Sequence, residues 1–520
     1  MQKEKRNLDT FYLAVILFLL FFVFGFLTYN YTGLWGDMAE YVNNPLRVLR
    51  GEIPYRDFWL LFPPGEVYLP AFLYKIFGLN VNVVLLLWPI VAALVGTFGF
   101  VLGKILFKNN WLAGLLALLL FFNGLGHVHF LLLLIATIFF AKYLKEGGGL
   151  RLFLSGVFVG LAFYFRFFEV AACALALVVA LLISFRADRL RVSRAIVMFL
   201  IFSGGVLLAM SIIYLPLINY WQLILDSVVL NSVGHGISMN LAYLTDVKSA
   251  LSSLLELESK GEFSFYKLAV FLRIGALYSL PFVVFFLGMF QFFGKKMGSL
   301  DKIFVVFLML WTLFEFPKVL GRADVSHLAH VVSPAIILLV FLIKNGNWKI
   351  WRVVAGFTAF LLVLQLPVRA YDVEQILAKP HYQLTTTHGR LFLEEQKQVE
   401  DAEKVINFIN LHSKEGDPIF VSSWYFPALY ALTDRSNPTY YDSLIDVIAE
   451  PSEEEQQRIC DGLIEGNGKG SVKIIVHNPN FGFDNNPKLS FINAAPLLQK
   501  CIEEKFKLAE KIGYYLMYLP

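Results

Sequence analysis

A polar loop rich in Pro and Gly follows the first apolar segment and carries the residues best suited to chemistry. Its first part, residues 35–41, contains Asp37, Glu40 and Tyr41. A carboxylate just outside a lipid bilayer could deprotonate or orient a hydroxyl nucleophile, or hold a divalent cation. The alternative is a helix cap, since Asp is a preferred cap residue and a helix-like stretch, Met38–Leu49, follows it. The two roles are compatible, and the residues alone leave both open for Asp37.

The same loop contains an adjacent pair of opposite charges, Arg56 and Asp57. A planar guanidinium can bind a phosphate through two parallel hydrogen bonds while the carboxylate orients it. Arg56 could equally be an interfacial anchor that keeps its charge in water, with Tyr55 and Trp59 in an aromatic belt. Both alternatives stay open for this pair.

Arg166 and Glu169 fall at the predicted outer end of the fifth apolar segment. Charges three residues apart on a helix can form a structural ion pair that lets a hairpin turn. An Arg at this depth also suits an anionic lipid headgroup, because charge held in a membrane is costly and is usually kept for function. The sequence does not separate these two roles.

The densest polar cluster among the short loops lies at residues 317–330 and includes Lys318, Arg322, Asp324 and His327. The two cations could neutralise a phosphate leaving group, and the imidazole could donate a proton to it. Asp324, three residues before His327, could set the tautomer of that ring. The alternative is a charged turn at the lipid surface, but two cations and two histidines in so short a loop favour a binding site.

Other polar residues carry weaker signals. His127 and His129 flank a short turn and make a poor metal pair without an adjacent carboxylate, so we interpret them as interfacial. The sequence contains no Gly-rich phosphate loop, no Ser-His-Asp order and no Cys/His zinc spacing. We therefore expect no nucleotide cofactor, while a divalent cation at Asp37 stays open.

The composition places these residues in a membrane protein. Of 520 residues, 57% are hydrophobic and 16% are charged, with a mean hydropathy of +0.63, well beyond the range of soluble globular proteins. A net charge of +4 without a basic face gives no reason to expect a nucleic-acid partner. About eleven apolar segments approach the ~20 residues that a spanning helix needs. They are Phe11–Tyr29, Val81–Phe107, Trp111–Phe122, Val128–Leu144, Leu150–Phe165, Val170–Phe185, Ala195–Leu217, Lys267–Phe293, Ile303–Phe316, His330–Ile343 and Ile350–Leu366.

Clusters of Lys and Arg occupy alternate loops between these segments. The positive-inside rule then places the amino terminus and those loops in the cytoplasm. Residues 30–80, 219–266 and 317–329 face outward, as does everything after Pro367, so the candidate residues share the outer side. We expect a multi-pass protein of a plasma (inner) membrane.

The composition becomes that of a soluble protein after Arg369, which predicts a membrane domain at residues 1–369 and an outward domain at residues 370–520. Alternating helical and strand-like stretches predict that the second is a small α/β domain. The expected helices are Leu393–His412, Phe426–Leu432, Glu453–Ile464 and Phe491–Phe506, and the expected strands are Pro418–Ser422, Val472–His477 and Tyr514–Tyr518. Cys460 and Cys501 could form a disulfide in an outward domain, although spacing does not establish one.

Taken together, these features resemble the GT-C glycosyltransferases, within them the bacterial and archaeal branch related to protein O-mannosyltransferases, aminoarabinose transferases and rhizobial core-sugar transferases. The shared features are an acidic residue in a long first outer loop, about eleven spans and a soluble outward tail. The motifs are Gly51–Phe58 (GEIPYRDF), Phe62–Gly65 (FPPG), Gly321–Leu328 (GRADVSHL), Pro427–Tyr430 (PALY), Asp434-Arg435, Asn437–Thr439 (NPT) and Tyr441-Asp442.

The resemblance implies an inverting glycosyltransferase that moves a sugar from a polyprenyl-phosphate donor to a lipid, glycan or protein acceptor at the outer membrane face. It matches Asp37 to the family's catalytic carboxylate, as base or acceptor-orienting group. Two residues separate Asp37 from Glu40, whereas many relatives have adjacent Asp and Glu, and Phe62 stands where aminoarabinose transferases carry Lys. The candidate substrate-binding residues are Glu40, Tyr41, Arg56, Asp57, Arg166, Lys318, Arg322, Asp324 and His327.

Other functions stay open. A lipid or oligosaccharide transporter or flippase would show internal symmetry and charges near the membrane midplane, whereas these polar clusters lie at the predicted outer ends of helices. A glycan polymerase or ligase would carry its large outer domain in mid-chain.

Overall fold

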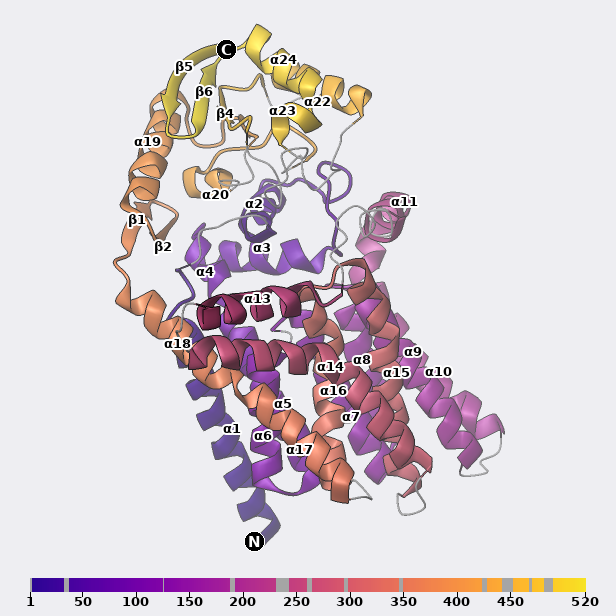
Figure 1. Ribbon diagram of the computed structural model, residues 1–520. Coiled ribbons are helices and arrows are strands. Elements are labelled where there is room, and N and C mark those ends of the chain that lie inside the picture. The colour runs from indigo at the N-terminus through magenta and orange to yellow at the C-terminus, as the bar shows by residue number, and fades with distance from the viewer. Residues whose placement is uncertain are drawn as a thin grey trace. The chain divides into compact units, whose positions relative to one another are not determined.

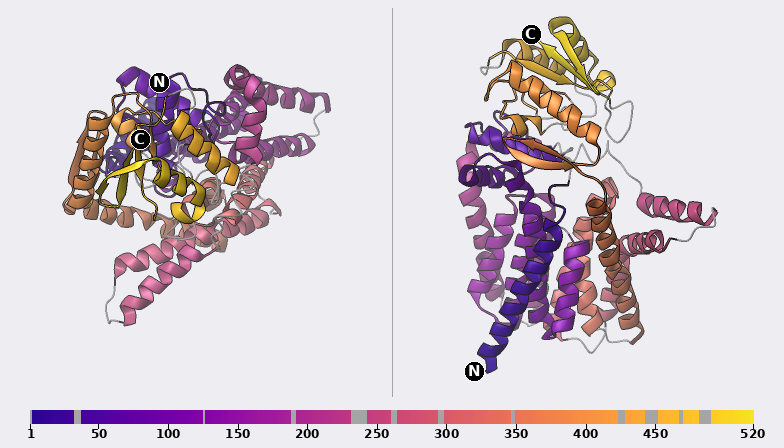
Figure 2. Two further views of the ribbon diagram at one scale, coloured as in Figure 1. Left: turned by 90° about the horizontal axis from the view of Figure 1, so that it is seen from above. Right: turned by 90° about the vertical axis from the view of Figure 1, so that its left-hand side faces the viewer.

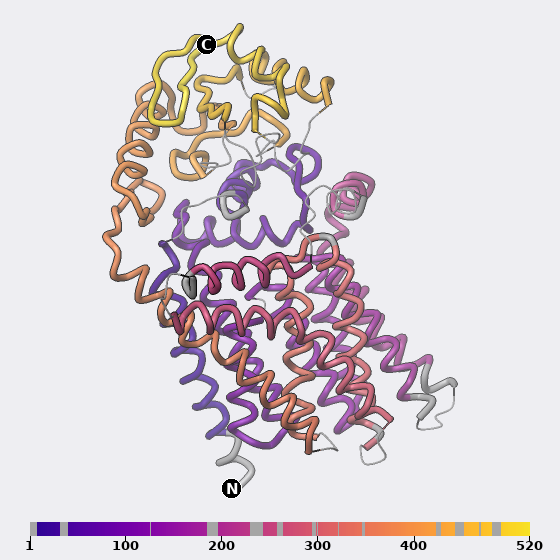
Figure 3. Tube along the Cα trace, in the orientation of Figure 1, coloured from indigo at the N-terminus to yellow at the C-terminus, as the bar shows by residue number. Residues whose placement is uncertain are grey.

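The structure is a computed structural model of the 520-residue chain (Figure 3). It describes residues 2–31, 37–124, 126–187, 192–230, 243–259, 264–293, 298–345, 349–422, 428–441, 452–466, 470–480 and 490–520. These residues form two compact units. The membrane unit comprises Met1–Leu27, Trp88–Asn219 and Gly236–Gln375, and the α/β unit comprises Thr28–Leu87, Tyr220–His235 and Ile376–Pro520.

The membrane unit consists of helices (Figure 1). They are α1 (Gln2–Phe26), α5 (Leu87–Phe107), α6 (Asn110–Asn123), α7 (Val128–Glu146), α8 (Gly149–Ala162), α9 (Phe168–Ala187), α10 (Val192–Tyr214), the 3-10 helix η1 (Leu215–Tyr220), α13 (Thr245–Ser259), α14 (Phe265–Phe293), α15 (Ser299–Gly321), α16 (Val325–Asn345), α17 (Lys349–Val363) and α18 (Gln365–Ala378).

Among the described residues, eight helical stretches are long and apolar enough to cross a membrane, and three further apolar helices are shorter. The three shorter helices are Asn110–Asn123, Gly149–Ala162 and Phe168–Ser184. All eleven predicted segments coincide with one of these helices. The prediction of a multi-pass α-helical membrane protein is confirmed.

Burial separates inner helices from peripheral ones. In α16, 72% of the residues in an apolar stretch of 18 residues are buried inside the structure, against 6% in α1. The exposed apolar side chains of α1 suit contact with lipid. Close approach of α8 and α10 depends on small residues, because a Cβ at Gly156 or Gly160 would collide with the backbone of α10, and one at Gly205 with that of α8. Such small-residue interfaces are typical of helices packed in membranes, where apolar burial alone drives no association.

The α/β unit combines residues from three parts of the sequence (Figure 1). Its helices are α2 (Asp37–Leu49), α3 (Gly65–Phe77), α4 (Val81–Leu85), α11 (Trp221–Ile224), the π-helix η2 (Leu225–Leu230), α19 (Gln396–His412), α20 (Leu429–Thr433), α22 (Glu453–Glu465), α23 (Phe491–Ala494) and α24 (Pro496–Lys505). Its strands are β1 (Tyr382–Thr386), β2 (Gly389–Leu393), β3 (Ile419–Val421), β4 (Ile474–His477), β5 (Lys507–Ile512) and β6 (Tyr515–Leu519).

The C-terminal part of this unit, drawn in orange to yellow in Figure 2, contains a four-stranded mixed sheet of order β3-β4-β6-β5. An apolar core lies on each face of the sheet. β3 runs parallel to β4, and β6 runs antiparallel to both β4 and β5. Because side chains alternate across a strand, Ile419 and Val421 join the core that contains α19, while Phe420 joins the core that contains α22 and α24. The prediction that the C-terminal part of the chain has an α/β fold is confirmed.

Residues of the first loop complete these cores. Val42 of α2, Tyr74 of α3 and Val81 of α4 are at most 2% exposed and pack in the α19 core, and Trp59 packs in the other core. At about 1.5–3 kcal/mol for each large apolar side chain buried, these contacts integrate the loop with the tail. Cys460 of α22 and Cys501 of α24 form a disulfide across the second core.

The structure corrects one predicted element of the tail. The expected single helix Phe491–Phe506 is two helices, α23 and α24, because Pro496 begins the second one. Proline lacks the N–H needed in a helix interior but fits a first turn. Of the expected helix Phe426–Leu432, residues 426 and 427 lie outside the described residues, and α20 covers the remainder from Leu429 to Thr433.

Candidate functional site

Asp37 is the first residue of α2, so its position at a helix start matches the prediction. Its side chain lies outside the described residues, and its catalytic and capping roles stay predictions. Glu40 and Tyr41 follow in the first turn of α2 and are partly buried, with Tyr41 packed against the α19 core. The helix therefore builds Tyr41 into the fold of the α/β unit.

The α/β unit contains a pocket of about 700 Å³ that includes two of the predicted site residues. The pocket is lined by Arg50, Gly51, Glu52, Tyr55, Arg56, Asp57, Leu223, Pro438, Thr439, Tyr440, Tyr441, Glu455, Arg458 and Ile459. Its walls come from the first loop, from α11 and from the tail, and a volume in this range is typical of sites for small molecules.

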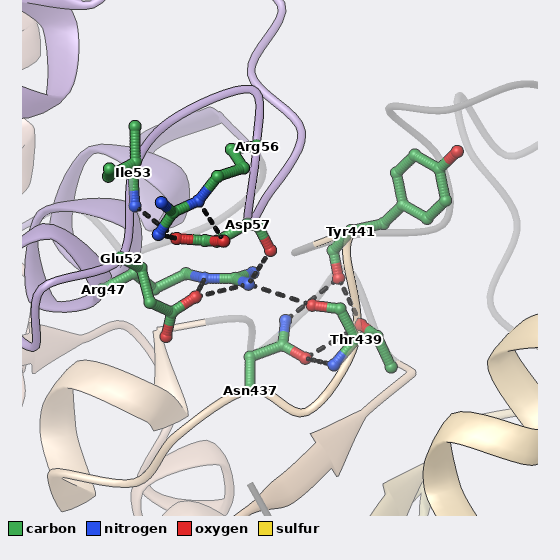
Figure 4. Close-up of polar contacts among 8 residues, drawn as sticks. All are labelled: Arg47, Glu52, Ile53, Arg56, Asp57, Asn437, Thr439 and Tyr441. Atoms are coloured by element: carbon green, nitrogen blue, oxygen red, sulfur yellow. Dashed lines mark hydrogen bonds and ion pairs between the residues drawn. The ribbon is translucent and has the colours of Figure 1, made fainter. Parts of the chain in front are cut away.

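Arg56 and Asp57 form a bidentate ion pair in this pocket (Figure 4). The Nε and Nη2 atoms of Arg56 lie 2.8 and 2.6 Å from the two carboxylate oxygens, and the backbone N–H of Ile53 donates to Oδ2 of Asp57 at 2.7 Å. The hydrogen bond to Asp57 and a second one to Tyr220 raise the pKa of the Arg56 guanidinium. A phosphate would have to compete with Asp57 for this fork, so the structure gives Arg56 a positioning partner rather than an open anion site.

Arg47 is the central cation of the network, and no pattern in the sequence marked it as a site residue. It is 3% exposed, its Nε donates to Glu52 at 2.8 Å, and its Nη2 donates to the carbonyl oxygens of Asp57 and Thr439 at 3.1 and 3.0 Å (Figure 4). The guanidinium also lies 4.7 Å from the ring centre of Phe58. Arg47 thereby joins the first loop to the tail at the floor of the pocket, and only the fold brings these partners together.

Tyrosines and a further arginine form the tail side of the pocket. The hydroxyl of Tyr441 donates to Glu455 at 2.9 Å, and Arg458 lies 5.7 and 5.9 Å from the ring centres of Tyr440 and Tyr441. Burial and then the hydrogen bond to Glu455 raise the pKa of Tyr441, so its hydroxyl stays a donor at neutral pH. Aromatic faces edged by planar charged groups suit a polyhydroxylated ligand, which offers both C–H surfaces and many hydroxyls.

Tyr55 has an unusual backbone conformation at this pocket. Its φ is +68°, a region that costs a bulky residue free energy. The loop retains it through the Tyr55 N–H bond to Phe58 O at 2.8 Å, the Tyr55 hydroxyl bond to Phe62 O at 2.7 Å, and the Tyr440 hydroxyl bond to Tyr55 O at 2.8 Å. Strain that is held in this way is common at binding sites.

The membrane unit contains a second polar cluster, which includes Arg166 and Lys318. Arg166 is 7% exposed and its Nη1 donates to Phe165 O at 3.0 Å. Lys318 is ion-paired with Glu169, which is 4% exposed, and Nδ1 of His330 lies 3.9 Å from the same carboxylate oxygen. The end of α15 thus meets the start of α9, and Lys318 provides Glu169 with a cationic partner from another helix.

Three histidines gather beside these charges, although the sequence separates them by 200 residues. The ring centres of His127, His129 and His330 lie 5.7 to 6.4 Å apart. His129 is 1% exposed, and its Nδ1 atom has no hydrogen-bond partner among the described residues. Our interpretation of His127 and His129 as interfacial residues missed this cluster, because only the fold brings their rings close to that of His330.

Arg322, Asp324 and His327 form a local network at the start of α16. Asp324 accepts from Arg322 Nε at 2.8 Å, from the backbone N–H of His327 at 2.9 Å and from Nδ1 of His327 at 2.8 Å. Burial alone would raise the pKa of Asp324, but the hydrogen bonds from His327 and Arg322 outweigh it and hold the pKa below its usual range. Because the Asp324 carboxylate only accepts, Nδ1 of His327 carries a proton, and Asp324 is placed to set the tautomer of that ring.

No family model and no curated protein sequence matches the chain. Among solved structures, it is similar to the crystal structure of the Archaeoglobus fulgidus oligosaccharyltransferase in complex with Zn and sulfate. That similarity covers 89% of this chain and 68% of the other, with 13% sequence identity and a TM-score of 0.48.

Proposed function

We propose that this protein is a membrane glycosyltransferase that moves a sugar from a polyprenyl-phosphate donor to an acceptor at the outer face of the membrane. The observation that carries the proposal is a basic cluster of the membrane unit, where the buried Arg166, the partly exposed Lys318 and three histidines gather among apolar helices. Ionised groups are rarely retained in such surroundings without a role. A lipid phosphate has the negative charge that this cluster would bind and the apolar tail that the surrounding membrane would hold.

In the proposed reaction an acceptor hydroxyl attacks the anomeric carbon, the bond from that carbon to the phosphate oxygen breaks, and the configuration inverts. The proton of the hydroxyl passes to Asp37, and the electron pair of the broken bond leaves with the polyprenyl phosphate. Cations fixed in a water-poor site stabilise that developing charge more strongly than they would in water. We assign this role to Arg166 and Lys318, with Arg322 and His327 as further phosphate ligands.

The histidine cluster supports a phosphate ligand more than a free metal ion. Arg166 and Lys318 bring two cationic side chains to the cluster beside the carboxylate of Glu169, and cationic side chains favour an anionic ligand. Imidazole N–H groups can donate to phosphate oxygens, and the buried Nδ1 atom of His129 has no hydrogen-bond partner among the described residues. An unsatisfied buried polar atom is costly, so a ligand that satisfied it would gain affinity.

We assign the acceptor to the pocket of the α/β unit, with Arg56 and Asp57 as the residues that position it. Glu40 and Tyr41 do not line this pocket, and we propose them as substrate-binding residues of α2, beside Asp37 in the sequence. The support is chemical: the lining offers aromatic faces from Tyr440 and Tyr441 together with charged donors and acceptors. These groups match the hydroxyls of a saccharide or of a hydroxylated side chain.

The test is Asp37→Asn in the purified full-length chain, assayed with a panel of polyprenyl-phosphate monosaccharides and a membrane-extract acceptor mixture. We expect at least a 100-fold loss of transfer, because removal of a general base or an oriented carboxylate typically costs 10²–10⁴-fold. Asp461→Asn, an exposed carboxylate of α22, serves as the matched control. Full activity of the Asp37 variant would refute this site, and a chain that binds the lipid but transfers no sugar would favour a transporter.

A further inference from the structure

We propose that His388, Glu415 and Asp434 form a divalent metal site in the α/β unit, for which Zn²⁺ is the best fit. One donor atom from each residue lies within 4.8 Å of the donor atoms of the other two. Ligands on a tetrahedral Zn²⁺ at about 2.0–2.2 Å lie roughly 3.4 Å from one another, so the three side chains must close by about 1.4 Å at most.

His388 is held in an orientation that suits a metal ligand. Its Nδ1 atom lies 3.2 Å from the carbonyl oxygen of Leu79, its backbone N–H donates to Thr386 Oγ1 at 3.2 Å, and its carbonyl accepts from the Val81 N–H at 2.8 Å. Because a carbonyl only accepts, Nδ1 must carry the proton, which leaves the lone pair on Nε2. Metal-binding histidines commonly use this arrangement, in which a backbone carbonyl fixes the tautomer.

Asp434 brings a carboxylate that is already oriented. It ends α20 in the left-handed conformation, with φ of +51°, and its backbone carbonyl accepts from the Gly416 N–H at 2.8 Å. Arg50 donates to Oδ1 at 2.5 Å. A carboxylate that ligates a metal is usually hydrogen-bonded in this way by an outer residue, and Arg50 neutralises one of the two negative charges when no metal is bound.

Glu415 supplies the adjustable ligand. It lies in the turn between α19 and β3, is exposed, and makes no hydrogen bond within the part of the chain that the structure describes. Its neighbour Arg435 does not occupy it, because that guanidinium donates to Ser413, Thr433 and Asn410. A mobile side chain can close the last gap around an ion at little cost, whereas His388 and Asp434 are anchored.

The ligand set selects the ion and its role. Imidazole favours Zn²⁺ over Mg²⁺ and Ca²⁺, which prefer all-oxygen sites. Three protein ligands leave a position for water. The metal would join the β1–β2 turn, the turn before β3 and the end of α20, so it would cross-link three segments of the α/β unit. Both of the unit's cysteines are bonded to each other and cannot contribute a thiolate.

The test uses the tag-free, full-length protein in detergent, stripped with a chelator and titrated with Zn²⁺ by calorimetry and with Co²⁺ by visible absorption. We expect one saturable site per chain and a higher thermal midpoint with Zn²⁺. His388→Ala and Asp434→Asn should each weaken binding at least 100-fold, and Asn preserves the left-handed cap. Glu415→Gln, which disturbs no hydrogen bond of the described residues, should weaken it at least 10-fold.

His412→Ala and Glu400→Gln are the matched controls, because both residues lie on α19 in the same unit. They should bind Zn²⁺ as the native chain does. Absence of a saturable one-to-one site would overturn the proposal. So would a site that is lost equally in the controls, or one that survives in both His388→Ala and Glu415→Gln. None of these results depends on transferase activity.

Discussion

The guanidinium of Arg47 donates to the carbonyl oxygen of Thr439 at 3.0 Å, although 392 positions separate the two residues in the sequence. Two further bonds accompany it, from Trp59 N–H to Tyr440 O and from the Tyr440 hydroxyl to Tyr55 O, both at 2.8 Å. The pocket of the α/β unit therefore exists only when the first loop and the tail are folded together.

Arg47→Met should destabilise the α/β unit by about 3–5 kcal/mol, because it removes the cation of a largely buried ion pair with Glu52 and two hydrogen bonds to backbone carbonyl oxygens. Denaturant unfolding in detergent, followed by the fluorescence of Trp59 among the other tryptophans, would measure it. Lys397→Met is the control: its ion pair with Asp401 is 3.6 Å long and its side chain is 73% exposed, so we expect a change within about 0.5 kcal/mol. Equal stabilities would contradict the role of Arg47.

The disulfide between Cys460 and Cys501 determines how many free thiols the chain should show. The chain has three cysteines, and a bond between Cys460 and Cys501 leaves Cys173, so the unfolded, unreduced chain should show one free thiol and the reduced chain three. A cross-link over a separation of 41 residues stabilises by about 4 kcal/mol in the chain-entropy treatment. The double variant Cys460→Ser/Cys501→Ser should therefore unfold at a lower temperature, whereas Cys173→Ser should still show the disulfide.

Lys318 can be tested separately from its ion pair with Glu169. Lys318→Met alone should lose both stability and donor affinity, because it leaves a buried carboxylate without its cation. The double variant Lys318→Met/Glu169→Gln removes both charges and should recover much of the stability. If Lys318 binds the donor phosphate, the KM for the polyprenyl-phosphate sugar stays at least 10-fold raised in the double variant. Recovery of KM together with stability would show that the residue is only structural.

His477 predicts that the stability of the α/β unit falls in mild acid. Burial lowers the pKa of this histidine to about 4, against a partial opposite effect from its bond to Gln499. The ring is neutral in the fold: Nε2 donates to Gln499 Oε1 at 2.7 Å, and Nδ1 accepts from Ser422 at 2.6 Å. Since the unfolded state takes up the proton first, stability present above about pH 6.5 is lost progressively as the pH falls toward about 4.

The full loss is about 3 kcal/mol, since each unit of pKa difference is worth about 1.4 kcal/mol. Urea midpoints measured from pH 4 to pH 7 would show the slope. His477→Gln should flatten it, whereas His412→Gln, in the same unit, should retain it. An unchanged slope in the His477 variant would place the titrating group elsewhere.

Local patterns predicted the membrane helices well. A run of apolar residues must form a helix in lipid because its backbone has no other hydrogen-bond partners there, and all eleven predicted segments are helical. The pattern fails for β5, where five of six residues are exposed and no alternation marks a strand, and for the β1–β2 hairpin. β5 pairs with β6 and β1 pairs with β2 across short turns, so these strands are specified by backbone pairing with a neighbouring strand and not by an apolar pattern of their own.

For the candidate sites too, contacts between near neighbours could be predicted from the sequence and contacts between distant segments could not. Bonds between near neighbours, such as Arg56–Asp57 and Asp324–His327, were visible in the sequence. Arg47, Arg458 and the meeting of His129 with His330 were not, because each depends on packing between distant segments. Asp37 was chosen from its position and from a family resemblance, and its side chain lies outside the described residues.

The core of the α/β unit contains residues from the first loop and from the tail, so it can be completed only late in synthesis of the chain. Val42, Tyr74 and Val81 are made early, yet the partners that bury them, from Leu384 onward, leave the ribosome about 300 residues later. At about 5–20 residues per second, the first loop waits roughly 15–60 s without the tail residues that complete the burial of those apolar side chains. During that interval the remaining spans must be inserted, so chaperone protection on the side of the membrane where this loop emerges would be a requirement of assembly.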